Sequence, residues 1–298
     1  MKTLLLIMNP TAGQRRAARF LAEIVALFSQ YGYENIVYMT AARGDGARIA
    51  ADQGHRADLI VCVGGDGTLN EVIDGVLRAG LTTPIGYIPA GSTNDFAAGL
   101  NLSRNVIQAA RDIMEGVPQT LDVGSFNGRH FSYVASFGAF TEASYATPQA
   151  AKNTLGHVAY LLEGVRELAN LRPARLRLEA DGRVLEGDYL YGAISNATSI
   201  GGILTMDPGQ VDLNDGLFEV TLVHNPENLI DLSAIVHALS TRQYDETPLI
   251  DFFTAHALRI TADADLPWTL DGEFEPGGPE IEVKNLYSAI RLVRRANK

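Results

Sequence analysis

Apolar residues along the first 120 positions fall into two alternating patterns. Continuous apolar runs predict buried strands at 2–8, 36–39, 58–63 and 84–88. Between them, apolar residues spaced three and four positions apart predict helices at 14–29, 42–53 and 68–79. Strands that alternate with helices in this way predict a parallel sheet that is covered by helices on both faces.

After about residue 121 the pattern changes to strand-like runs separated by turn residues. These runs lie at 130–137, 174–179, 189–196, 218–223 and 256–262. Turns are predicted at Asp181-Gly182 and Asn214-Asp215-Gly216, and helices at 155–171 and 227–239. We therefore expect a mainly antiparallel, β-sandwich-like second domain. The predicted organisation is a parallel α/β domain at 1–120, a β-rich domain at 121–290, and a tail at 291–298 that returns to the first domain.

Composition agrees with a folded protein of two domains. The chain has 298 residues, of which 46% are hydrophobic and 20% are charged, and domains commonly have about 100–200 residues. The single cysteine, Cys62, cannot form an internal disulfide, which fits a reducing compartment. No apolar run reaches the ~18–20 residues that span a bilayer, and the apolar run at 1–8 is too short for a signal peptide. We expect a cytoplasmic protein.

The net charge of −11 argues against two kinds of partner. Nucleic-acid binding relies on basic surface that neutralises phosphates, so general nucleic-acid binding is not expected. An acidic protein is not broadly attracted to anionic membranes either, so any contact with the inner membrane face must be local and peripheral. Arginines do cluster in three places, which we interpret as solvated surface: 15–19, 172–177 and 291–295.

The strongest chemical signal is a glycine-rich turn after the predicted strand at 58–63. Gly64, Gly65 and Gly67 lack a Cβ atom, so backbone N–H groups there can approach phosphate oxygens closely. The helix that we expect to begin at Thr68 would direct its positive dipole end toward the same anion. Asp66 would repel a phosphate unless a cation such as Mg²⁺ lay between them. The alternative is a tight strand-to-helix turn with Thr68 as the helix cap.

This turn matches neither of the common nucleotide-binding motifs. A P-loop is excluded because the chain has no Gly-x-x-x-x-Gly-Lys-Ser/Thr segment. A Rossmann fingerprint is excluded because Asn70 stands where the third glycine would be.

Two further loops follow predicted strands in the same way. The segment 89–96 offers a glycine, two hydroxyls, an amide and a carboxylate just before a helix, and 9–13 follows the first strand. The alternative for 89–96 is a helix start capped by Ser92 or Thr93. Because ligands bind beyond the carboxyl ends of parallel strands, we expect all three loops to meet at one edge of the sheet.

A fourth element, Leu270-Asp271-Gly272-Glu273, places two carboxylates on a short turn. Asp-Gly alone is a common hairpin turn, which is one interpretation. A carboxylate there could also accept a proton from an attacking hydroxyl group, as a general base does.

Together these segments resemble the catalytic domain of diacylglycerol kinases, which sphingosine and ceramide kinases share. The resemblance rests on Asn9-Pro10-x-x-Gly13, Gly64-Gly65-Asp66-Gly67-Thr68-x-Asn70-Glu71, Pro89-Ala90-Gly91-x-x-Asn94-Asp95 and Asp271-Gly272-Glu273. It covers nearly the whole chain in the family's order, and the soluble bacterial lipid kinases of about 300 residues look closest. NAD kinases and phosphofructokinases are similar more distantly.

The resemblance implies roles for named residues. It implies ATP contacts from residues of the first domain: Asn9, Thr40, Gly64, Gly65, Asp66, Gly67, Thr68, Leu69, Asn70, Glu71, Gly91, Thr93 and Asn94. It implies a catalytic group made of Asp66, Asp95, Asp271 and Glu273, in which Asp66 and Asp95 organise phosphates and Mg²⁺ and Glu273 is the general base. It also implies a structural Mg²⁺ site at Asp212, Asp215 and Leu217, which Asp122 links to the active cleft.

The chain departs from the family at one place. Many relatives have a basic residue soon after Asn-Asp-Phe-Ala, where this chain has Ala98 and Gly99. We expect a contact with phosphate or lipid head group there to be missing, or to be supplied by Arg15, Arg16 or Arg19.

The function implied is transfer of the γ-phosphate of ATP to the hydroxyl of a lipid or lipid-like alcohol, with an acyl groove bordered by the predicted helix at 155–168. One alternative is an NAD or other small-molecule kinase, which shares the glycine-rich turn. Another is a non-catalytic nucleotide- or lipid-binding protein. The acceptor lipid stays open, as does the choice between monomer and homodimer.

Overall fold

The computed structural model describes residues 1–15, 17–138, 173–197, 199–200, 204–205 and 212–295. The chain forms two compact units, each assembled from separate segments. The first unit comprises Met1–Val123, Leu213–Gly216 and Leu286–Lys298, and the second comprises Gly124–Asp212 and Leu217–Asn285.

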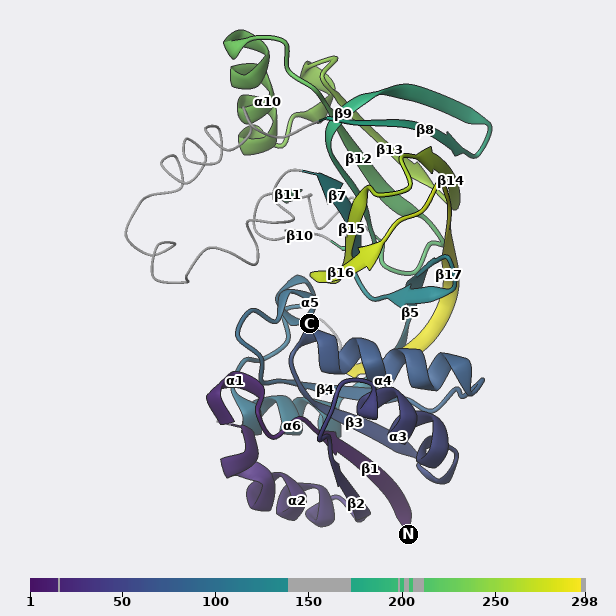
Figure 1. The fold of residues 1–298 in the computed structure, drawn as a ribbon. Helices are drawn as coiled ribbons and strands as arrows, with labels where there is room; N and C mark the ends of the chain where they lie inside the picture. Colours follow the sequence, from purple (N-terminus) through teal and green to yellow (C-terminus); the bar gives the residue numbers. More distant parts are fainter. Residues whose placement is uncertain (16, 139–172, 198, 201–203, 206–211, 296–298) are drawn as a thin grey trace. The chain divides into compact units, whose positions relative to one another are not determined.

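The first unit is built on a parallel sheet, with the strand order β4-β3-β1-β2 (Figure 1). These strands are β1 (Lys2–Met8), β2 (Tyr33–Met39), β3 (Leu59–Gly64) and β4 (Ile85–Pro89). Every residue of β3 and β4 is buried, which agrees with their continuous apolar runs. The last strand, β17 (Glu280–Arg294), adds to this sheet where Leu292 pairs in parallel with Ile85.

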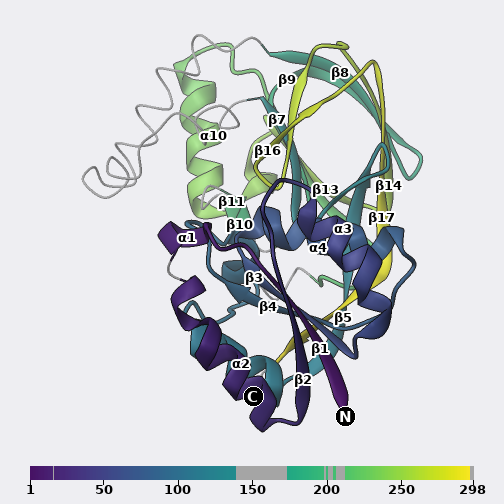
Figure 2. The ribbon, with the colours of Figure 1, turned by 60° about the horizontal axis from the view of Figure 1, so that its bottom comes forward.

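Helices cover both faces of this sheet, and Figure 2 shows α2 on the opposite side from α3 and α4. The helical segments are α1 (Ala12–Arg15), η1 (Ala17–Phe20), α2 (Leu21–Gln30), α3 (Asp45–Gln53), η2 (Gly54–Arg56), α4 (Asp66–Arg78), α5 (Asp95–Gly99) and α6 (Val106–Glu115). On one face, α2 and α6 pack their buried residues against Leu4, Leu6, Val61 and Ile88. On the other face α3 packs closely on α4, because a Cβ atom at Gly75 would lie 2.2 Å from the Ala47 carbonyl oxygen.

The second unit is an antiparallel assembly of strands. Its long path runs β16-β15-β7-β9-β8-β14-β17, with β12 pairing both β9 and β13, and β5 pairing β6. The bounds are β5 (Val117–Phe126), β6 (Arg129–Phe131), β7 (Val134–Gly138), β8 (Ala174–Ala180), β9 (Arg183–Ser195), β10 (Ser199–Ile200), β11 (Leu204–Thr205), β12 (Phe218–His224), β13 (Ile250–Ala255), β14 (Ala257–Ala262), β15 (Pro267–Leu270) and β16 (Glu273–Pro276). Helix α10 (Leu229–Thr241) and η3 (Tyr244–Glu246) precede β13.

The core of the second unit gathers around aromatic side chains. Trp268 is fully buried, and its ring centroid lies 5.1 Å from that of Phe126 and 4.9 Å from that of Phe137. Phe131 stacks on Phe218 at 5.7 Å. Such pairs contribute about 0.5–1.5 kcal/mol each beyond the burial of their apolar area.

The predicted fold class, a parallel α/β domain followed by an antiparallel sandwich-like domain, is confirmed. Three local predictions were wrong. The helix expected at 14–29 is divided into α1, η1 and α2, and the helix expected from Thr68 begins two residues earlier, at Asp66. The strand expected at 130–137 is broken between β6 and β7, where backbone N–H groups bind the Asp271 carboxylate instead of a neighbouring strand.

The predicted helix at 155–171 lies outside the described residues. Within the residues that are described, each helix is too short or too polar to cross a membrane.

Candidate active site

The glycine-rich turn joins β3 to α4. Gly65 is the N-cap residue of this 13-residue helix, so the cap position itself carries no side chain. The N–H groups of its first turn have no carbonyl acceptor within the helix, and they carry the positive end of the helix dipole. Position 64 favours glycine for a steric reason, because a Cβ atom there would lie 2.6 Å from the Cβ atom of Thr68. Strand-to-helix turns of this kind commonly bind anions.

The three predicted loops meet in the first unit, as expected. A Cβ atom at Gly91 would lie only 2.6 Å from the Gly65 Cα atom, so the loop at 89–96 and the glycine-rich turn after β3 touch through their backbones. The Asn9 side-chain amide donates to the Thr68 hydroxyl at 3.3 Å, which connects the loop at 9–13 to α4. Gly13, with φ of +54°, lies against the Ala90 carbonyl oxygen.

Asn94 shapes the loop that contains Gly91. Its side-chain oxygen accepts the Gly91 N–H at 2.9 Å, and its amide donates to the Gly91 carbonyl at 2.9 Å. Asn94 is 5% exposed and has a left-handed backbone, with φ of +55°. It is the N-cap residue of α5, so the helix-cap alternative at Ser92 or Thr93 was wrong.

The two predicted catalytic aspartates of the first unit, Asp66 and Asp95, are neighbours. The Asp66 carboxylate accepts the backbone N–H of Asp95 at 2.9 Å. The Tyr87 hydroxyl lies 3.5 Å from the other Asp66 oxygen. Sequence reasoning missed Tyr87, because a tyrosine in an apolar strand is indistinguishable from an ordinary core residue.

Glu71 and Thr40 organise the segment between β2 and α3. Glu71 accepts the N–H groups of Gly44 and Gly46 at 2.7 and 3.0 Å, and the Thr40 N–H donates to the Met8 carbonyl at 2.9 Å. Asp45, which sequence reasoning missed, accepts the N–H groups of the two residues after Thr40. Its bonds to Arg48 and to these N–H groups lower the pKa of Asp45 to about 2, so it stays ionised at neutral pH.

The paired carboxylates of the second unit differ in their surroundings. Asp271 and Gly272 form the turn between β15 and β16, with φ of +51° and +80°. Asp271 is 8% exposed, and its carboxylate accepts the N–H groups of Ser132, Tyr133 and Val134 at 2.6, 3.0 and 3.1 Å. These hydrogen bonds hold the β15–β16 turn against the junction of β6 and β7.

Glu273 is more accessible than Asp271. Its side chain is 39% exposed, and its carboxylate accepts a hydrogen bond from the Arg129 guanidinium at 2.8 Å. Arg129 also pairs with Glu275. Sequence reasoning missed Arg129, because it lies 144 residues before Glu273 and no local pattern marks it.

The residues expected at a structural metal site divide between the units. In the first unit, Asp122 accepts the N–H groups of Gly216 and Ser288, each at 2.7 Å, and so ties the 213–216 segment to β17. Asp215 belongs to this segment, whereas Asp212 and Leu217 belong to the second unit. Across the described part of the chain, no three His, Cys, Asp or Glu side chains are grouped so as to hold a metal ion on their own.

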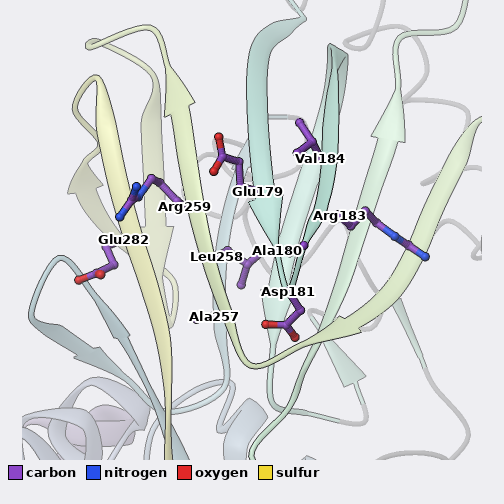
Figure 3. Close-up of a pocket in the computed structure, with 10 residues that line it drawn as sticks. Glu179, Ala180, Asp181, Arg183, Val184, Ala257, Leu258, Arg259 and Glu282 are labelled. Carbon is purple, nitrogen blue, oxygen red and sulfur yellow. The ribbon is translucent and has the colours of Figure 1, made fainter.

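A separate cavity of about 310 Å³ lies in the second unit beside the β8–β9 turn (Figure 3). None of the predicted site residues lines it. Arg183 and Arg259 point away from each other in Figure 3, so their guanidinium groups do not form one positively charged patch in the cavity. At its turn, the His256 backbone N–H and ring donate to Asp181, which lowers the pKa of Asp181.

Comparison with known proteins identifies two family models along the chain. Residues 3–126 match the diacylglycerol kinase catalytic domain. Residues 134–294 match the YegS C-terminal NAD kinase beta sandwich-like domain. Together the two models cover most of the sequence.

Curated relatives agree with these models. The chain is 32% identical over 300 residues to a diacylglycerol kinase of Bacillus subtilis strain 168, covering 100% of this chain and 98% of that protein. It is 32% identical over 270 residues to a diacylglycerol kinase of Staphylococcus aureus strain MRSA252, covering 90% and 85%.

Solved structures from Bacillus anthracis strain Sterne have the same fold. One, described as a candidate diacylglycerol kinase, has a TM-score of 0.82 at 24% identity and covers 99% of this chain and 95% of its own. Another, described as a diacylglycerol kinase, has a TM-score of 0.75 at 21% identity and covers 99% and 97%. The family models and the curated relatives show that this chain belongs to the diacylglycerol kinase family, a family of kinases.

Proposed function

We propose that the protein transfers the γ-phosphoryl group of ATP to the hydroxyl group of a diacylglycerol-like lipid. The observation that carries the proposal is the meeting of three loops at the N-terminus of α4, where Gly65 and Gly91 touch. Such a surface suits a polyphosphate, because backbone N–H groups and the helix dipole both favour negative charge.

The nucleotide contacts would come from the first unit. The glycine backbone of 64–67 would lie against the phosphates, with Thr68, Leu69 and Asn70 on the same first turns of α4. Asn9, Gly91, Thr93 and Asn94 would border them from the adjacent loops. Thr40 and Glu71 would set the segment between β2 and α3, which Glu71 already orders through two backbone N–H groups.

Magnesium is the cation that this arrangement would hold. Carboxylate and carbonyl oxygens are the ligands that Mg²⁺ prefers, and the bond from the Asp95 backbone N–H to the Asp66 carboxylate brings these two residues together. Bound there with the nucleotide, Mg²⁺ would neutralise charge on the transferring phosphoryl group. Asp212, Asp215 and Leu217 offer oxygens of the same kind for a second, structural ion, and Asp122 orders the segment that contains Asp215.

Glu273 is the group that we assign as general base. The hydroxyl oxygen of the lipid forms a bond to the γ-phosphorus while the bond from that phosphorus to the β–γ bridging oxygen breaks. ADP leaves with the bridging oxygen, and the hydroxyl proton passes to the Glu273 carboxylate. Arg129 would hold that carboxylate in place, and Asp271 would hold the turn that carries it.

The acceptor and the place of action follow from this assignment. A diacylglycerol-like acceptor resides in a membrane, so the enzyme would act from the cytoplasm by transient peripheral contact with the inner membrane face.

A transfer screen tests the proposed function. The protein is incubated with Mg·ATP and vesicles made from a total lipid extract, with NAD as a separate soluble acceptor, and products are identified by mass. We expect a phosphorylated diacylglycerol-like lipid. Phosphorylation of NAD alone would identify a different kinase, and ATP binding with no transfer to any acceptor would indicate a non-catalytic binding protein.

A further inference from the structure

Tyr87 occupies the point at which the two glycine loops meet. It lies in β4, opposite Cys62 of β3, and is 2% exposed. Its strand neighbours Gly86 and Ile88 face α6 and α2, since a Cβ atom at Gly86 would meet Ile113 and Ile88 belongs to the core on that side. The alternation of side chains along a strand therefore directs Tyr87 to the other face, where α4 lies.

The Tyr87 hydroxyl lies among three acceptor oxygens from both loops. It is 3.3 Å from the Gly64 carbonyl, 3.4 Å from the Asn94 side-chain oxygen and 3.5 Å from an Asp66 oxygen. A phenol has one proton to donate, and bonds of this kind are usually about 2.7–2.8 Å long. The hydroxyl thus lies within reach of all three oxygens, at distances longer than a typical bond of this kind.

The same three groups already fix the backbone around the loops. The Ala90 N–H donates to the Gly64 carbonyl at 2.7 Å. The Gly91 N–H donates to the Asn94 oxygen, and the Asp95 N–H donates to Asp66. A shift of the Tyr87 proton from one acceptor to another therefore acts on groups that set the spacing of both loops.

We propose that Tyr87 is a positioning residue, whose hydroxyl orients the Asp66 carboxylate and couples it to the Asn94 loop. An ionised carboxylate is the strongest acceptor of the three, so the proton favours Asp66. The proton has a second acceptor in Asn94 whenever a cation draws on the Asp66 oxygens. This inference rests on the proposed nucleotide site, and it adds a residue that does not itself touch the reacting atoms.

A double-mutant cycle between Tyr87→Phe and Asp66→Asn tests the coupling. We expect Tyr87→Phe to weaken Mg·ATP binding, measured by calorimetry, and kcat/KM for ATP by about tenfold, as the loss of a hydrogen bond to a charged group does. KM for the lipid should stay unchanged. In the Asp66→Asn background, the same Tyr87→Phe change should cost less than about threefold, because the partner of the hydroxyl is already altered.

The controls separate positioning from folding. Tyr31→Phe removes a hydroxyl from the same unit, where its partner is Glu115, and should leave binding and turnover at the wild-type level. Thermal unfolding of each variant reports stability. If Tyr87→Phe does not fold, Tyr87→Met, whose flexible apolar chain fills irregular space, takes its place in the cycle.

Two results would overturn the assignment of Tyr87. One is wild-type Mg·ATP binding and kinetics in Tyr87→Phe, and the other is a tenfold loss that is equally large in both backgrounds, which would mean independent effects. Failure of the wild-type protein to bind Mg·ATP would instead remove the proposed nucleotide site itself.

Discussion

At the scale of single residues, the carboxylates of Asp271 and Glu273 differ in their surroundings, and we propose different roles for them. Asp271 is almost buried and binds three backbone N–H groups, whereas Glu273 is partly exposed and binds the guanidinium group of Arg129. A general base must be able to reach its substrate, and a carboxylate that fastens a backbone junction must not move. We therefore assign the base to Glu273 and the scaffold to Asp271.

Replacing Glu273 with glutamine tests the base. The amide keeps the size of the side chain but cannot accept the hydroxyl proton, so turnover should fall by about 10²–10⁴-fold. The affinity for Mg·ATP, measured by calorimetry, should stay near the wild-type value. Turnover at the wild-type rate would rule out Glu273 as the base.

Replacing Asp271 with asparagine should act on stability first. One acceptor oxygen is lost, so buried N–H groups at the junction of β6 and β7 lose their partner, at a cost of about 1–3 kcal/mol for each unsatisfied group. Urea unfolding of Asp271→Asn should show this loss, while Glu273→Gln unfolds like the wild type. Equal stability of Asp271→Asn and wild type would contradict the scaffold assignment.

At the scale of elements, the site depends on how closely the glycine loops approach each other. Gly65 and Gly91 meet backbone to backbone, so a Cβ atom at Gly91 would lie only 2.6 Å from the Gly65 Cα atom, and one at Gly65 would lie 3.3 Å from the Gly91 Cα atom. The close approach brings the N-terminus of α4 and the loop before α5 to one surface. We therefore expect the spacing of these two glycines to affect the proposed anion-binding surface.

Replacing Gly91 with alanine tests this approach. The added methyl group would lie 2.6 Å from the Gly65 Cα atom, so the loops must separate, and we expect at least about tenfold weaker Mg·ATP binding by calorimetry. Gly187→Ala is the matched control, because a Cβ atom there meets only ordinary contacts at 3.4 Å. Undiminished binding by Gly91→Ala would show that the loop spacing does not matter.

The success of sequence reasoning also varied by element. The strand at 2–8 was predicted with its observed bounds, because a short continuous apolar run that ends at a turn signal is typical of a buried strand. The helix at 14–29 was wrong, because its apolar spacing continues through a stretch that folds as α1, η1 and α2. Periodicity reports which residues are buried, and it does not report where the backbone bends.

At the site, residues marked by a local sequence motif were predicted, and residues that only folding brings together were not. The glycine loops and Asp66 were predicted because their residues are adjacent in sequence and their chemistry is local. Tyr87 and Arg129 were missed, because each acts on a residue that only the folded chain brings near. The opposite surroundings of Asp271 and Glu273 could not be read from an Asp-Gly-Glu triplet either.

At the scale of the whole molecule, the proposed reaction draws on residues of both units. The proposed nucleotide contacts come from residues of the first unit and the proposed base from the second, whose two segments alternate in sequence with the three segments of the first. Membership of the diacylglycerol kinase family applies to the chain as a whole, because the two family models together span residues of both units.

The fate of labelled phosphate tests the central claim most directly. Wild-type protein is incubated with vesicles containing diacylglycerol and Mg·ATP labelled in either the α or the γ position, and the lipid is then extracted. The account predicts label in the lipid from γ-labelled ATP and none from α-labelled ATP. Lipid labelled from the α position, or no labelled lipid from either nucleotide, would contradict it.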